Sequence, residues 1–174
     1  MNIGRLRVDA EQDYDIILLD TCSILADAFE PCMQKLLRSR NKSALAIPCS
    51  VRLELRYLAQ KPNSNCRAAA VRALEGVDAL ISAGYVGEIG RTESPEMGDF
   101  SILKYVVQHC VQDRVLVITQ DRNLTADLRR LNLIRSLPIH PVNVLRIAKD
   151  GSLEVLPDKI FSENLRRTGQ VCRV

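Results

Sequence analysis

The chain has 174 residues, 47% of them hydrophobic and 26% charged, which is enough to bury a core and excludes a disordered or low-complexity protein. The 24 Lys and Arg exceed the 21 Asp and Glu by three, so the charge permits a polyanionic partner without requiring one. Three Phe, four Tyr and no Trp argue against base stacking as the main mode of recognition.

Short apolar runs alternate along the first half of the chain with longer amphipathic segments. Residues 15–20 form an apolar run that ends in a carboxylate, typical of a strand buried on both faces, and residues 44–48 predict a second strand. The expected helices of this half comprise residues 23–29, 31–40, 50–60 and 64–83. Ser50 is the expected N-cap of the third helix. Residues 84–98 contain four of the eight glycines and predict a loop with at most a short strand.

The same alternation continues in the second half. The expected elements are a helix at 100–110, a strand at 114–119, a helix at 123–131, a strand at 134–144 and a hairpin at 144–148 and 153–156. This order predicts a three-layer α/β/α fold with a central, mostly parallel sheet. We expect one domain over residues 1–160, with its core at 15–145, followed by a basic and disordered tail at 161–174.

Six cysteines and two histidines are too dispersed for a zinc site, and no C-x-x-C pair is present. Free thiols of this kind indicate a reducing compartment. Residues 1–15 contain no signal peptide, and the clearest apolar runs, at 16–19 and 115–118, are too short to cross a membrane. We therefore expect a cytoplasmic protein without a membrane partner.

Four acidic residues lie where an α/β sheet binds its ligands, beyond the carboxyl ends of strands. Asp20 ends the first strand, and Asp121 follows the strand at 114–119. Asp99 begins the helix before that strand, and Glu54 lies on the helix after the second strand. Taken singly, Asp20 and Asp99 can serve as helix caps and Asp121 as a turn residue.

Glu54 shares a helical stripe with Val51, Leu55 and Leu58, so its carboxylate faces the core and needs an arginine or a metal ion as partner. Four converging acids repel one another unless a divalent cation neutralises them. Oxygen ligands without His or Cys select Mg²⁺ or Mn²⁺. Such a centre suits phosphodiester hydrolysis, because the cation activates water and stabilises the charge on the phosphate.

These residues resemble the PIN domain, a family of metal-dependent nucleases. The matching segments are Leu18-Leu19-Asp20-Thr21-Cys22-Ser23, Pro48-Cys49-Ser50-Val51 running into Glu54-Leu55, Gly98-Asp99 with Ile102, and Ile118-Thr119-Gln120-Asp121 with Leu124. The likeness covers residues 15–139. The chain departs from compact members such as the VapC-type toxins in its extra hairpin, its basic tail and the loop at 84–98.

The resemblance implies an endoribonuclease, either a toxin or an RNA-processing enzyme, that binds Mg²⁺ or Mn²⁺ through Asp20, Glu54, Asp99 and Asp121 and leaves a 5′-phosphate and a 3′-hydroxyl. Thr119 and Ser23 match hydroxyl positions that orient an acid or a water molecule, and Asp127 is a further acid on a solvated helix face. RNA is the implied substrate, with a homodimer and an inhibitor protein of the antitoxin type as implied partners.

Basic residues near the acids are candidates for binding RNA phosphates, namely Arg52, Arg56, Lys104 and Arg122. When the four acids are set aside, 24 basic residues remain against 17 acidic ones. This balance indicates an acidic pocket within a basic surface. The alternative is a PIN-like binding or assembly module without catalysis. A haloacid dehalogenase-type phosphatase is excluded because Cys22 replaces the second acid of D-x-D, and a serine hydrolase is excluded because no G-x-S-x-G is present.

Overall fold

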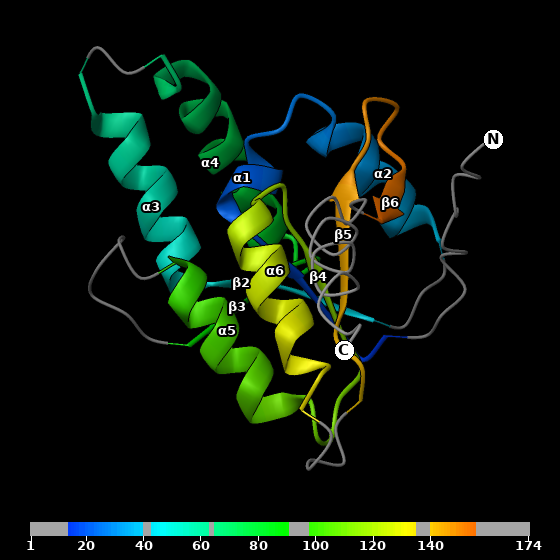
Figure 1. Cartoon of the computed structure of the whole chain (residues 1–174). Helices are drawn as coiled ribbons and strands as arrows, with labels where there is room; N and C mark the ends of the chain where they lie inside the picture. Colours follow the sequence, from blue (N-terminus) through cyan, green and yellow to red (C-terminus); the bar gives the residue numbers. More distant parts are fainter. Residues whose placement is uncertain (1–13, 40–42, 63–64, 91–97, 135–139, 156–174) are drawn as a thin grey trace, which may run out of the picture.

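A computed structural model describes residues 14–39, 43–62, 65–90, 98–134 and 140–155. The strands are β1 (Ile16–Leu19), β2 (Ala44–Pro48), β3 (Gly87–Ile89), β4 (Val115–Ile118), β5 (Asn143–Ile147) and β6 (Leu153–Val155). The helices are α1 (Thr21–Ile24), α2 (Phe29–Arg38), α3 (Cys49–Gln60), α4 (Arg67–Ser82), α5 (Gly98–His109) and α6 (Arg122–Leu131). Together they form an α/β fold around one sheet (Figure 1).

The six strands form a single, mostly parallel sheet in the order β3-β2-β1-β4-β5-β6. Only the pairing of β5 with β6 is antiparallel. The apolar runs that predict strands lie at its centre, and all four residues of β4 are buried. The prediction of a mostly parallel sheet with strands buried on both faces is therefore confirmed.

The strand order reverses between β1 and β4. From β1 the chain adds β2 and β3 on one side, then returns through α5 to add β4 and β5 on the other. Because parallel crossovers are right-handed, the helices of the two halves cover opposite faces, and α5 and α6 lie side by side across one face (Figure 1). This arrangement is compatible with three layers. The carboxyl ends of β1 and β4 border the topological switch point, where such sheets bind ligands.

Three sequence-based predictions about elements are wrong. The helix expected at 23–29 does not form, because α1 ends at Ile24 and residues 25–28 form turns and a bend before α2 begins at Phe29. The strand expected at 134–144 does not form at 134 or at 140–142, and residues 135–139 lie outside the described part. Its place is taken by β5, which pairs with β4 on one side and with β6 on the other, so the fourth parallel strand is also the first strand of the predicted hairpin. Ser50 is not an N-cap, because α3 begins one residue earlier, after Pro48.

None of the helices within the described ranges combines the length and the apolar character needed to cross a membrane. The cysteines in those ranges are free, as expected, and comprise Cys22, Cys32, Cys49, Cys66 and Cys110. The sixth cysteine and the predicted tail at 161–174 lie outside the described residues.

Candidate functional site

Each of the first four strands is followed by one of the predicted acids. Asp20 comes directly after β1, and Asp121 comes three residues after β4. Glu54 lies on α3, which follows β2, and Asp99 lies in the first turn of α5, which follows β3. The acids therefore all belong to segments that leave the carboxyl edge of the sheet.

Thr119 links Asp20 to Asp121 at the end of β4. Its hydroxyl donates a hydrogen bond to Oδ2 of Asp20 at 2.7 Å and accepts one from the backbone N–H of Asp121 at 2.9 Å. Asp20 and Thr119 are both buried, with 3% and 0% of their surface exposed. Thr119 thus makes the contact that its predicted role of orienting an acid requires.

Asp20 and Asp121 are also helix caps. Oδ1 of Asp20 accepts a hydrogen bond from the N–H of Thr21, and Oδ1 of Asp121 accepts bonds from the N–H groups of Asn123 and Leu124. Since a cap fixes the carboxylate against the first turn of its helix, the capping and the functional interpretations of these two acids do not exclude each other.

Glu54 is held by the first residue of α1. Its Oε2 accepts a hydrogen bond of 2.6 Å from the hydroxyl of Thr21. A β-carbon added to Gly98 would lie 3.0 Å from this oxygen. The start of α5 therefore packs closely against Glu54. Burial raises the pKa of Glu54, the bond from Thr21 opposes that rise, and the charge of Asp20 adds to it. The partner is a hydroxyl, where we expected an arginine or a metal ion.

Cys22 belongs to the site, although the sequence analysis did not include it. Its thiol donates to Oδ2 of Asp20 at 2.6 Å and accepts from the N–H of Gln120 at 3.1 Å. Burial, reinforced by Asp20, raises the pKa of Cys22 to about 12, so the thiol keeps its proton and acts as a donor to the carboxylate. The signal for this role in the sequence is a cysteine two residues after a strand-end aspartate.

Asp99 lies within reach of the charges of the other three acids. Partial burial, followed by the charges of Asp20, Asp121 and Glu54, raises the pKa of Asp99 to about 6. Among the described residues, no Lys, Arg or His forms an ion pair with any of the four acids. Within the described ranges, no cationic side chain therefore relieves the repulsion by pairing with these acids.

The side chains fit the charge of a divalent cation but do not form a ready coordination shell. Within the described ranges, no three Asp, Glu, His or Cys side chains are arranged so that they could hold a metal ion. The donors are nevertheless all carboxylate oxygens, the kind that Mg²⁺ and Mn²⁺ prefer. Mg²⁺ usually keeps several of its waters and is held by one or two carboxylates together with substrate phosphates, so a site of this kind does not need three side chains already gathered around the ion.

Two other predicted residues have structural partners. The hydroxyl of Ser23 donates to the backbone carbonyl of Ile118 at 2.9 Å, so it ties α1 to β4 and does not orient an acid as expected. Asp127 pairs with Arg130 at 2.7 Å on the solvent side of α6, in agreement with a solvated helix face.

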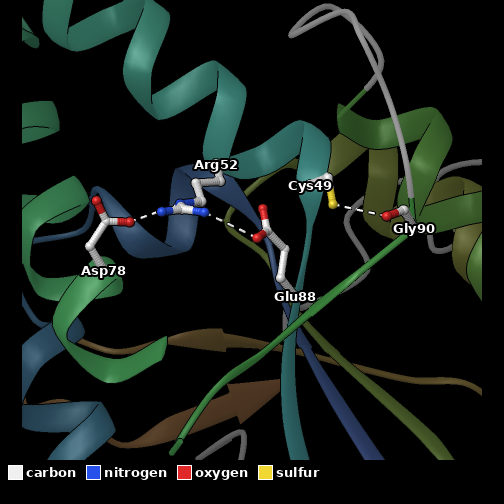
Figure 2. A network of polar contacts seen from close by, with 5 residues as sticks. All are labelled: Cys49, Arg52, Asp78, Glu88 and Gly90. Atoms are coloured by element: carbon white, nitrogen blue, oxygen red, sulfur yellow. Dashed lines mark hydrogen bonds and ion pairs between the residues drawn. The ribbon is translucent and has the colours of Figure 1, made fainter. Parts of the chain in front are cut away.

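The predicted RNA-binding residues differ in what they contact. Arg56, Lys104 and Arg122 are exposed. Arg52 instead bridges three elements, because its guanidinium contacts Asp78 of α4 at 2.8 Å and Glu88 of β3 at 3.1 Å (Figure 2). A guanidinium shared by two carboxylates has little charge left for a phosphate, so the structure favours a stabilising role for Arg52.

We expect Arg52→Ala to lower the free energy of unfolding by about 1–2 kcal/mol, since it removes two partly buried ion pairs and the packing of the arginine stem. Urea denaturation measures this loss. Arg56→Ala, an exposed change on the same helix, is the matched control and should leave stability within about 0.5 kcal/mol of the wild type. Equal losses in both variants would contradict the bridging role.

A comparison of the chain with protein-family models and with curated proteins found no match in either set.

Proposed function

We propose that this protein is a Mg²⁺- or Mn²⁺-dependent endoribonuclease with a PIN-like fold. The observation that carries the proposal is the coupling of Asp99 to the other three acids at the carboxyl edge of the sheet, with no ion pair to them among the described residues. Asp20 is buried, and Glu54 and Asp121 are half-buried. Carboxylates that are partly withdrawn from water beside like charges are costly to a fold, and such costs are concentrated at functional sites.

In this proposal Asp20, Glu54, Asp99 and Asp121 hold the cation. A divalent ion bound there supplies charge stabilisation for the scissile phosphate and lowers the pKa of water. Asp20 is oriented by Thr21, Cys22 and Thr119, and Glu54 by the hydroxyl of Thr21. The basic excess outside the four acids, 24 against 17 residues, suits a polyanionic strand.

A PIN-like binding module without catalysis is the second candidate. The observation that favours it is the lack, among the described residues, of three side chains arranged to hold a metal ion. Among the residues that the structure describes, in contrast, Glu54 is paired with a hydroxyl and with no arginine, whereas a module without metal would need a cation to neutralise its charge.

A Mn²⁺ titration of the wild type and of Asp20→Asn distinguishes the two candidates. At about 100 times the dissociation constant, the ion should stabilise the wild type by about 2.7 kcal/mol, which corresponds to a rise in Tm of roughly 5–10 °C for a chain of this size. Asp20→Asn should lose most of that rise. It should also cut single-stranded RNA at least about 100-fold more slowly, because even residues that only orient metal ligands are worth about 10- to 100-fold.

Glu75→Gln, an exposed change on α4, is the matched control and should behave as the wild type does. If the wild type gains no stability from Mn²⁺ or Mg²⁺ and cuts no RNA, the binding module replaces the nuclease.

A further inference from the structure

A pocket lies between the start of α3, the end of β3 and α5. Its volume is about 250 Å³, and its lining includes Cys49, Ser50, Gly90, Phe100 and Lys104. It shares α3 and α5 with the acidic site: Ser50 stands one helical turn before Glu54, and Lys104 stands five residues after Asp99. The volume is below the 300–1,000 Å³ usual for drug-sized ligands, so the pocket suits a single small group.

Ser50 gives this pocket an unused hydrogen-bonding group. The residue is fully buried, with 0% of its surface exposed, and its hydroxyl has no hydrogen-bond partner among the described residues. A buried hydroxyl without a partner is costly to a fold. A ligand that reaches Ser50 through the pocket would remove this cost.

The start of α3 lines the same pocket. This helix has twelve residues, and no side chain caps it, because its N-cap is Pro48. The first N–H groups of a helix carry a partial positive charge and bind anions. Ser50 lies in this first turn, so its hydroxyl and the uncapped N–H groups are available to one and the same ligand.

Among the described residues, the pocket has one cationic lining side chain and one acid beside it, Glu88, whose charge acts on the thiol of Cys49. Of the described residues that line it, Lys104 alone is charged. Glu88, the acid closest in sequence to the pocket wall at Gly90, is paired with Arg52 (Figure 2). The thiol of Cys49 donates to the carbonyl of Gly90 at 2.9 Å, which fixes the end of β3 against the start of α3 and keeps this wall in place.

We infer that this pocket binds a phosphate group of the substrate strand, next to the phosphate that the acidic site attacks. The ligand is held by the hydroxyl of Ser50, the first N–H groups of α3 and the ammonium group of Lys104. Phe100 lines the same pocket and is 56% exposed, so a base attached to this phosphate can stack on its ring. That ring favours a nucleotide strand over free phosphate. The assignment to the substrate strand rests on the proposed nuclease function, whereas the binding of phosphate does not.

Inorganic phosphate is the first probe. In two-dimensional NMR of the full chain, the N–H signals of residues 49–51 should shift and saturate with phosphate, and chloride at equal ionic strength should not reproduce this. Ser50→Ala should weaken phosphate binding about tenfold, the usual worth of a hydrogen bond to a charged group. The variant should fold, because it removes a hydroxyl that has no partner. The absence of a saturable shift at these residues would overturn the proposal that the pocket binds phosphate.

A five-residue oligouridylate is the second probe, bound to the full chain without divalent ions. Lys104→Gln should reduce the slope of log K against log salt by about 0.7, the value for one phosphate contact on a single strand. Lys149→Gln, an exposed change in the β5–β6 turn, should leave the slope unchanged. Equal slopes in both variants would overturn the assignment to a strand. If phosphate shifts residues 49–51 while the protein neither binds nor cuts RNA, the phosphate pocket is supported and the nuclease function fails.

Discussion

Asp99→Asn should melt at a higher temperature than the wild type when metal ions are removed at pH 7.5, and should cut RNA at least about 100-fold more slowly when they are present. The folded state raises the pKa of Asp99 to about 6 from an ordinary value of 3.8, through burial and the charges of Asp20, Asp121 and Glu54. A raised carboxyl pKa means that the folded protein disfavours the ionised form. The asparagine removes that charge and with it the repulsion.

The pH dependence of this gain has a defined sign. Above pH 6 the carboxyl of Asp99 is ionised in both states, and the full penalty falls on the folded protein. As the pH drops from 6 to about 4 the folded carboxyl takes up a proton first, so the penalty disappears and the two melting curves should converge. Thermal melts in chelator from pH 4 to pH 8 measure the difference. Glu75→Gln, on the exposed face of α4, is the control for loss of one negative charge. An Asp99→Asn protein that melts below the wild type at pH 7.5 would contradict the coupling of the acids.

The fold could be predicted where a strand is marked by its own run of apolar residues. The runs of β1 and β4 are apolar throughout, and only a strand buried on both faces needs such a run. The failure at 134–144 has a different origin. The segment contains Pro138 and Pro141, and the true strand, β5, begins at Asn143 and pairs on both of its sides. Local periodicity does not reveal that one strand serves both the parallel sheet and the hairpin, because this depends on partners distant in sequence.

The positions of the four acids could likewise be predicted, because each follows a strand in a sheet whose carboxyl edge is shared. Their partners could not. Thr21 meets Glu54 across 33 residues, and Thr119 meets Asp20 across 99. Arg52 illustrates the same limit. The sequence places it near the acids but does not reveal that Asp78 and Glu88 already pair with it.

Thr119→Val should cost about 1–3 kcal/mol of stability and lower kcat for RNA cleavage by about 10- to 100-fold with little change in KM. Valine has nearly the shape of threonine, so the change leaves no cavity. It removes the donor to Oδ2 of Asp20 and leaves the N–H of Asp121 without its acceptor. Both acids then lose the contact that orients them, although neither is altered. Denaturation and steady-state kinetics at saturating Mn²⁺ measure the two effects.

Two further substitutions separate positioning of the acids from stability alone. Thr119→Ser keeps the hydroxyl and should restore most of kcat. Thr125→Val removes a buried hydroxyl of the same kind, but its hydrogen bond goes to the backbone carbonyl of Asp121 and not to a carboxylate; it should therefore lower stability while leaving kcat within a few-fold of the wild type. If Thr125→Val lowers kcat as much as Thr119→Val does, activity follows general stability, and the bond from Thr119 to Asp20 has no separate role. If Thr119→Ser folds but does not restore kcat, the hydroxyl is not what orients Asp20. The orienting contact is then the one from Cys22, the other side-chain donor to the same oxygen.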